Sequence, residues 1–277
     1  MATTTSERPA AEPPPQDQTT TEQSLRRTAQ EIFQHVENNA HDEVRRSPHA
    51  LAFSGFAGGI SMGLTGLGVA SALAALPASP NREFLAYLLY PIGFIAVIIG
   101  RAQLFTENTL YPVALILSER RHFVDTLRLW TLVFTFNILG AIAFAALAIL
   151  TDALPPGIHK ELVQLGIAGS QVGFAHVFWS GVIGGWIIAL VAWMVTASHW
   201  TIGQIAVIWL LTFVVGIGHF AHCIASSGEI MSAVFAGQVP FVHYLHWLWL
   251  ATAGNIIGGV LIVTLLNFGQ VKVGETR

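Results

Sequence analysis

The sequence predicts an all-α membrane protein with six transmembrane spans in two inverted three-helix repeats, in which the second and fifth spans are broken. Three observations support this prediction. Only 10% of the 277 residues are charged and 53% are hydrophobic, whereas a soluble domain has about 25% charged residues. Six apolar stretches each reach the ~20 residues that cross a bilayer. Polar and glycine motifs recur in the same order in both halves of the chain.

The N-terminal part of the chain is polar. Residues 1–21 are rich in Thr, Pro, Gln and Glu, and we expect them to be disordered. Residues 22–46 follow with Ile32, Phe33 and Val36 at helical spacing, and charged residues lie on the other faces. This pattern predicts a cytoplasmic amphipathic helix that lies on the membrane surface or on a neighbouring subunit.

The apolar stretches lie at 50–76, 84–118, 126–151, 172–197, 202–236 and 244–268, within a transmembrane domain expected at 47–269. The second and fifth stretches are too long for one straight helix, and polar breaks interrupt them at 104–109 and 216–229. Arg residues cluster before the first stretch and after the second. The positive-inside rule therefore places both termini in the cytoplasm, including a tail at 270–277. We expect a multi-pass protein of the bacterial plasma (inner) membrane.

Two motifs define the repeat. Ser-Gly-x-x-Gly-Gly occurs at 54–59 and again at 180–185, and Asn-Ile-x-Gly occurs at 137–140 and 255–258. Each half holds one broken stretch between its two motifs. Because three spans are an odd number, the second half must run through the membrane upside down. Inverted repeats of this kind are typical of transporters with a site near the membrane midplane.

The second break carries the strongest candidates for contact with a polar solute. His222 can donate a hydrogen bond to an anion, and near its ordinary pKa of about 6.5 it can also give a proton. His219 is expected one helical turn earlier on the same face. Ser226 belongs to a run that can end one half-helix and cap the next.

The first break supplies partners for that histidine. The hydroxyl of Thr106 could bond His222 and set its direction. Asn108 could cap the second half-helix, whose positive N-terminal end would attract an anion. Arg101 and Glu107 are expected to be an ion pair with a structural role, with a proton relay at Glu107 as the alternative.

A second class of function is a membrane haem or metal protein. His219 with His222, and His243 with His246, are two histidine pairs at helical spacing. The sequence adds no supporting carboxylate or cysteine ligands, and its single cysteine, Cys223, lies in an apolar segment. The tryptophans near His243 favour an interfacial belt instead. We therefore expect no metal and no cofactor.

These residues resemble a known family. Leu-Phe-Thr-x-Asn at 104–108, the break around His222 and Gly-Asn-Ile-Ile-Gly-Gly at 254–259 are similar to motifs of the formate/nitrite transporter family, over roughly residues 45–268. The resemblance implies an aquaporin-like fold, a homopentamer with one pore per subunit, and passage of small monovalent anions such as formate, nitrite, hydrosulfide or lactate, often linked to protons. It identifies His222 as the central histidine and Thr106 as the loop threonine.

The resemblance also implies narrow constrictions on either side of the central pair. The positions that correspond are Phe94, Tyr90, Phe105 and Val215. We also expect His219, Asn108, Ser226 and Asn255 among the polar pore residues. The chain departs from the family pattern at Gln103, Ala221, Ser226 and Gly185, and His219 is an extra ionisable group, which indicates a divergent branch. We expect a transporter or channel for small monovalent anions of weak acids, not an enzyme. A channel for neutral small solutes is the alternative within transport.

Overall fold

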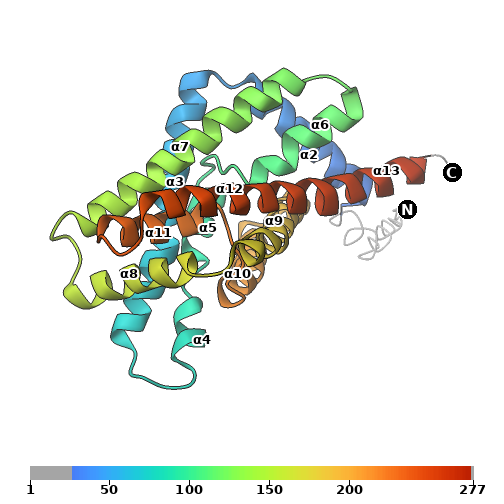
Figure 1. The fold of residues 1–277 in the computed structure, drawn as a ribbon. Helices are drawn as coiled ribbons and strands as arrows, with labels where there is room; N and C mark the ends of the chain where they lie inside the picture. Colours follow the sequence, from blue (N-terminus) through green and yellow to red (C-terminus); the bar gives the residue numbers. More distant parts are fainter. Residues whose placement is uncertain (1–26, 276–277) are drawn as a thin grey trace, which may run out of the picture.

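The computed structural model describes residues 27–275, and every regular element in that range is a helix (Figure 1). The tail expected at 1–21 lies outside the described residues. Long helices form the frame: α3 (Pro48–Ala75), α7 (Phe123–Ile149), α9 (Phe174–Ala197) and α12 (Phe241–Ile257), which continues through the π-helix η2 (Gly258–Leu265) into α13 (Leu266–Glu275). The prediction of an all-α membrane fold is confirmed. The last helix passes the boundary expected at 269 without a break.

Both long apolar stretches are divided into shorter helices. The stretch 84–118 becomes α4 (Arg82–Tyr87), α5 (Ile92–Ile99), the 3₁₀ turn η1 (Glu107–Thr109) and α6 (Tyr111–Glu119). The stretch 202–236 becomes α10 (Thr201–Ile217) and α11 (Ala225–Phe235). Within the described residues, five helical segments are long and apolar enough to cross a membrane, and α10 is apolar but shorter.

The two breaks begin with the same backbone turn. At the end of α5, Arg101 has φ +58°, and the N–H of Ala102 donates to the carbonyl of Val97 at 3.0 Å. At the end of α10, His219 has φ +51°, and the next N–H donates to the carbonyl five residues earlier, also at 3.0 Å. This is the Schellman motif, which usually places glycine at the left-handed position. Here Arg101 and His219 take that position instead.

A buried asparagine holds each break in the same way. The Asn137 side chain on α7 accepts from the N–H of Phe105 at 2.8 Å. It donates to the carbonyls of Gly55 at 2.7 Å and Gln103 at 2.8 Å. Each asparagine therefore ties its break to the helix that carries the Ser-Gly motif.

The second half repeats these bonds. The Asn255 side chain on α12 accepts from the N–H of Cys223 at 2.9 Å. It donates to the carbonyls of Gly181 at 2.7 Å and Ala221 at 2.9 Å. The motifs recognised in the sequence thus make equivalent hydrogen bonds in both halves.

The N-terminal amphipathic helix is α2 (Ala29–Arg45). Thr28 and Glu31 form a capping box, and the hydrogen bond from the Thr28 N–H lowers the pKa of the Glu31 carboxyl. Its apolar face, with Phe33 and Val36, is buried against α6, α9 and the C-terminal helix of the same chain. The expected position on a membrane surface or a neighbouring subunit is therefore wrong for this face, because apolar side chains of its own subunit cover it.

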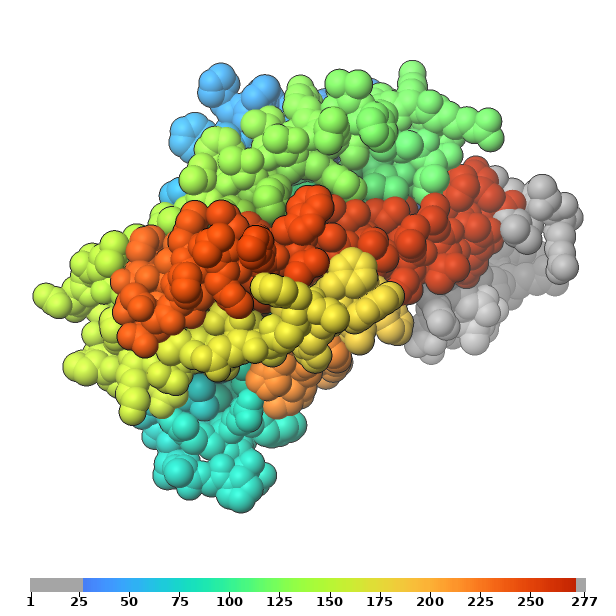
Figure 2. Space-filling model, in the orientation of Figure 1, coloured from blue at the N-terminus to red at the C-terminus, as the bar shows by residue number. Residues whose placement is uncertain are grey.

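One helix was not predicted. The segment between the third and fourth apolar stretches forms α8 (Pro156–Ser170), which packs on α11 and α3. Figure 2 shows the C-terminal helices crossing the surface between α7 and α8. The α8 sequence mixes apolar and charged residues over 15 positions, so composition alone gave no membrane-span signal.

Candidate functional site

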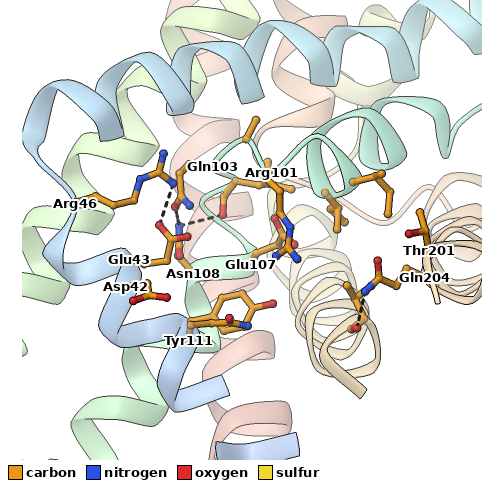
Figure 3. Close-up of a pocket in the computed structure, with 16 residues that line it drawn as sticks. Asp42, Glu43, Arg46, Arg101, Gln103, Glu107, Asn108, Tyr111, Thr201 and Gln204 are labelled. Atoms are coloured by element: carbon orange, nitrogen blue, oxygen red, sulfur yellow. Dashed lines mark hydrogen bonds and ion pairs between the residues drawn. The ribbon is translucent and has the colours of Figure 1, made fainter. Parts of the chain in front are cut away.

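Two cavities open at opposite ends of α5 and α10. The α2-side cavity, of about 350 Å³, is lined by α2, by the first break and by Thr201 and Gln204 at the start of α10 (Figure 3). The α4-side cavity, of about 680 Å³, is lined by Tyr87 and Tyr90 and by Val215 near the end of α10, together with parts of α8, α9 and α11. The two broken stretches therefore contribute residues to the lining of both cavities.

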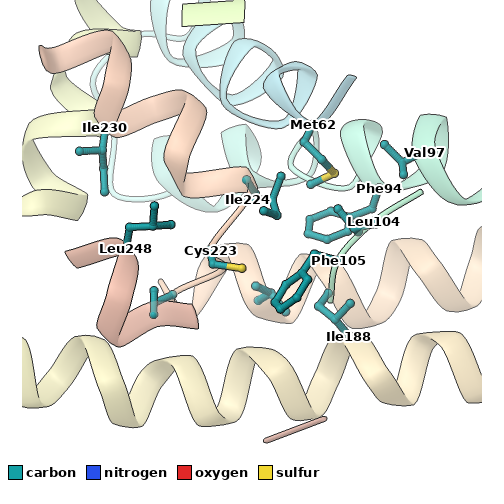
Figure 4. Close-up of a cluster of buried hydrophobic side chains, with 14 of the residues drawn as sticks. Met62, Phe94, Val97, Leu104, Phe105, Ile188, Cys223, Ile224, Ile230 and Leu248 are labelled. Carbon is teal, nitrogen blue, oxygen red and sulfur yellow. The ribbon is translucent and has the colours of Figure 1, made fainter. Parts of the chain in front are cut away.

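Buried apolar side chains separate the cavities. Met62 from α3, Phe94 from α5, Leu104 from the first break and Ile224 from the second belong to one core cluster and are almost completely shielded from solvent (Figure 4). A charged solute cannot cross such a barrier cheaply, because an unpaired ion in a low-dielectric interior costs many kcal/mol.

Thr106 and His222 are the polar pair inside this barrier. Both have 0% exposure and line neither cavity. The Thr106 Oγ1 lies 2.8 Å from the His222 Nε2, and the ring of Phe94 packs edge-on against the imidazole at 5.1 Å between centroids. The structure thus brings together the two breaks at the contact that the sequence suggested.

The hydrogen bonds of His222 define its neutral tautomer. Its Nδ1 accepts from the backbone N–H of Ala225 at 3.0 Å, so the lone pair is on Nδ1 and the proton of the neutral ring is on Nε2. The Nε2–H then donates to the Thr106 oxygen, which leaves the threonine O–H free to donate to a permeant. His222 also caps the N-terminus of α11 through its contact with Ala225.

The caps expected from Asn108 and from Ser226 do not form. Asn108 instead donates to the Gln103 side chain at 2.8 Å and to a backbone carbonyl, and α6 has no side-chain cap. Ser226 likewise makes no cap on α11 and lines the α4-side cavity. Both predicted capping roles are wrong, because Asn108 bonds within its own loop and the N–H of Ala225 at the start of α11 bonds to His222.

His219 does not share a helix face with His222. Since α10 ends at Ile217, His219 turns to the α4-side cavity. There its Nε2 lies 3.0 Å from the Glu83 carboxylate, and its Nδ1 lies 3.2 Å from the hydroxyl of Tyr87. The two rings are therefore engaged by separate partners, and their geometry gives no support to a shared metal or haem. His243 contacts the carbonyl of Ser170.

The predicted constriction residues lie at different depths. Tyr90 and Val215 line the α4-side cavity, and Phe94 lies deeper, with its ring 5.8 Å from that of Tyr90. Phe105 lines neither cavity; its ring packs on Trp130 and on another phenylalanine of α7. Phe105 therefore packs against α7 and lines neither cavity.

Arg101 and Glu107 line the α2-side cavity together, but no ion pair within 4.0 Å joins them. The expected pairing is therefore wrong. The left-handed conformation of Arg101 directs the chain away from α5 before η1 begins. Glu107 is only 9% exposed and retains an unpaired carboxyl group.

Asn255 has 0% exposure, and both of its amide N–H groups are bonded to backbone carbonyls. It has no donor left for a permeant. Its side chain holds the second break through these bonds, and its place in the polar pore stays a prediction.

Sequence reasoning gave no role to Glu229. This residue lies on α11 and lines the α4-side cavity. A carboxylate inside an apolar stretch was the available signal, since such groups are rare within membrane segments and are usually functional.

Comparisons with known proteins agree with this architecture. Residues 30–269 match the family model described as Formate/nitrite transporter. The chain is 32% identical over 261 residues to the Inner membrane protein YfdC of Escherichia coli (strain K12), covering 91% of this chain and 81% of that protein.

Two solved structures share the fold. An FNT family ion channel has a TM-score of 0.77 at 19% identity, and the match covers 86% of this chain and 98% of that channel. A pentameric formate channel with formate bound has a TM-score of 0.69 at 19% identity, with 86% and 99% covered. Because the family model matches more than half of the chain, this protein belongs to the formate/nitrite transporter family.

Proposed function

We propose that this protein passes small monovalent anions of weak acids across the membrane, and that their passage is linked to protons. The observation that carries the proposal is the Thr106–His222 pair, buried in an apolar barrier between two cavities. The substrate class is supported by membership of the formate/nitrite transporter family and by the formate held in the pentameric structural neighbour.

The barrier contains one hydrogen-bonding position for a permeant, at the Thr106–His222 pair. A permeant that enters the barrier from the α2-side cavity passes Leu104 and meets the O–H of Thr106. The hydrogen bond from His222 Nε2 orients this hydroxyl group. The hydrogen bond from the Thr106 O–H to the permeant replaces part of the lost hydration at the narrowest region. His222 can take up a further proton only on Nδ1, which would displace the N–H of Ala225. The proposed role of His222 is therefore to orient Thr106 and hold α11 while remaining neutral.

We further propose that the chain crosses the membrane six times as two inverted three-helix repeats, with α10 and α11 together forming the fifth span. The matching hydrogen bonds of Asn137 and Asn255 support the repeat. Both termini are proposed to be cytoplasmic, so the α2-side cavity faces the cytoplasm. A homopentamer with one pore per subunit is proposed from the pentameric structural neighbour.

Flux into proteoliposomes tests the function. Formate, nitrite, acetate, lactate and hydrosulfide are offered at two pH values to the wild type and to His222→Phe. Since a buried polar group left without its hydrogen bond costs about 1–3 kcal/mol, loss of the oriented Thr106 should reduce flux about 5- to 100-fold. His222→Asn, which keeps polar atoms at this position, should retain more activity.

The matched control is His246→Asn, because His246 is exposed and lies far along the chain on α12. It should transport as the wild type does. Unchanged anion flux in His222→Phe would contradict the proposed role of the pair. Osmotic swelling with uncharged solutes but no anion flux would favour the neutral-solute channel instead.

Cysteine labelling tests the orientation. The natural Cys223 is buried, so it should not react with a membrane-impermeant maleimide. Gln238→Cys, in the loop after α11, should be labelled from outside intact cells. Gln34→Cys on α2 should be labelled only after lysis. The opposite pattern would reverse the proposed orientation.

A further inference from the structure

Each cavity contains one carboxyl group that is at least half-buried and lacks a partner. Glu107 in the α2-side cavity is buried, and Glu229 in the α4-side cavity is half-buried. In the part of the chain that the structure describes, no hydrogen bond or ion pair reaches either side chain. The barrier with His222 lies between them. Two unpaired acids on opposite sides of one barrier suggest a shared task in permeation.

Glu229 differs from the other carboxylates of its cavity. Glu83 pairs with His219 at 3.0 Å, and Glu161 pairs with Arg82 at 2.9 Å. The lining of this cavity contains no Lys or Arg. An ionised Glu229 would therefore repel an entering anion without a nearby cation to offset it.

The packing makes room for the Glu229 side chain. A methyl group on Gly66 of α3 would lie 2.7 Å from the Glu229 Cγ and 3.2 Å from its Oε1. Gly166 of α8 allows the backbone of α11 to approach closely. Tyr87 and Tyr90 line the same cavity, and the ring of Tyr90 lies 5.8 Å from that of Phe94 in the barrier. The position of Glu229 is thus built by three helices.

Glu107 is held by its backbone. Its N–H donates to the carbonyl of Leu104 at 3.2 Å, and its carbonyl accepts from Leu110 at 3.0 Å. The neighbouring carboxylate Glu43 is already paired with Arg46 at 3.2 Å. Glu107 is therefore the buried acid of this cavity that stays free to meet a permeant.

We propose that Glu107 and Glu229 exchange the proton that accompanies the anion, one on each side of the barrier. This inference rests on the proposed function. When the anion arrives, the protonated carboxyl of Glu229 gives its proton to an oxygen or sulfur of the anion, and Glu229 becomes a carboxylate. The neutral acid crosses past Thr106. It then gives the proton to the carboxylate of Glu107, and the anion leaves.

Water in the cavities then restores both groups. Glu229 takes a proton from the water of the α4-side cavity, and Glu107 releases its proton to the water of the α2-side cavity. Protons and charge therefore balance over one cycle. The same steps in reverse serve flow in the other direction. His222 is less suited to this exchange, because Ala225 and Thr106 occupy both of its ring nitrogens.

Other titratable groups surround the two acids and enter any pH profile. Those that line the cavity around Glu229 are Glu83, Tyr87, Tyr90, Glu161, His176 and His219. Those that line the cavity around Glu107 are Asp42, Glu43, Arg46, Arg101 and Tyr111.

The test measures protons and formate together. Proteoliposomes with the full-length protein and a trapped pH-sensitive dye receive radiolabelled formate, and the ratio of proton to formate uptake is recorded. We expect Glu229→Gln and Glu107→Gln each to lower formate-driven proton uptake about tenfold and to flatten the flux profile between about pH 5.5 and pH 7.5. Glu229→Asp and Glu107→Asp should restore proton uptake.

The control is Asp152→Asn, because Asp152 is an exposed carboxylate in the loop between α7 and α8 and lines neither cavity. It should keep the wild-type ratio. Gln variants that elute as the wild type does and retain the proton ratio and pH profile would overturn the inference. If Glu229→Gln fails to fold, the Glu229→Asp variant is used instead. An unchanged midpoint of its formate flux against pH would then contradict proton exchange at Glu229. Wild-type protein without formate, nitrite or hydrosulfide flux would instead overturn the proposed function itself.

Discussion

The two asparagines that clamp the breaks should be equally important for stability. Asn137→Ala removes three hydrogen bonds of 2.7 to 2.8 Å, and Asn255→Ala removes three of 2.7 to 2.9 Å. The carbonyls of Gly55 and Gly181 lie inside helices and can keep their helical donors. One buried N–H and one buried loop carbonyl remain orphaned in each variant. At about 1–3 kcal/mol for each orphaned group, the expected loss is about 4 kcal/mol.

Thermal unfolding in detergent checks this value. At about 2–4 °C per kcal/mol for a chain of this size, each variant should lower the Tm by about 10 °C. Thr131→Ala on α7 is the control, because it removes one exposed side-chain hydrogen bond of 2.8 Å and should change stability by less than about 0.5 kcal/mol. A Tm change in either asparagine variant as small as that of the control would refute the reasoning. So would a large effect in one half only.

Two further predictions concern close packing and pH. Gly59→Ala should cost about 2 kcal/mol or more by Tm, because the new methyl group would overlap a backbone carbonyl of α7. Gly169→Ala on α8 should be neutral or stabilising, because the new methyl group would meet only the Ile230 side chain, at an ordinary contact distance of 3.8 Å; equal losses in the two variants would contradict the argument. The hydrogen bond from Arg121, followed by that from His41, lowers the pKa of Glu119 below its ordinary 4.5. A lowered carboxyl pKa stabilises the folded state above the unfolded pKa, and this contribution is lost as the pH falls through the folded pKa. Glu119→Gln should therefore increase hydrogen exchange in α2 near pH 7 but not near about pH 3, and an equal increase at both values would contradict it.

The sequence motifs predicted the contact between Thr106 and His222 but not all of its hydrogen bonds. Thr106 and His222 were singled out because polar residues inside apolar stretches are expensive unless they serve a purpose. Their contact at 2.8 Å follows from two breaks meeting at the same depth. The motifs could not show that Ala225 engages Nδ1, since that bond depends on where α11 begins.

Other expectations failed for a common reason. Arg101 and Glu107 have opposite charges within one break, yet no ion pair within 4.0 Å joins them, and the backbone between them is not a regular helix. His219 follows the end of α10, so helical spacing no longer relates it to His222. Spacing rules apply only while the backbone stays regular, and both breaks end that regularity.

The sequence by itself determined the class of this protein. Its low charge and long apolar stretches leave a helical membrane fold as the stable solution, because backbone groups in lipid must bond within their own segment. The repeated Ser-Gly and Asn motifs also located the parts of the chain that bond in the same way. Only the tertiary structure decided which polar groups are left without a partner. Glu107 and Glu229 have no hydrogen bond or ion pair in the described residues, whereas Glu43 is paired with Arg46 and Glu161 with Arg82. Pairing across distant segments is set by packing rather than by local sequence.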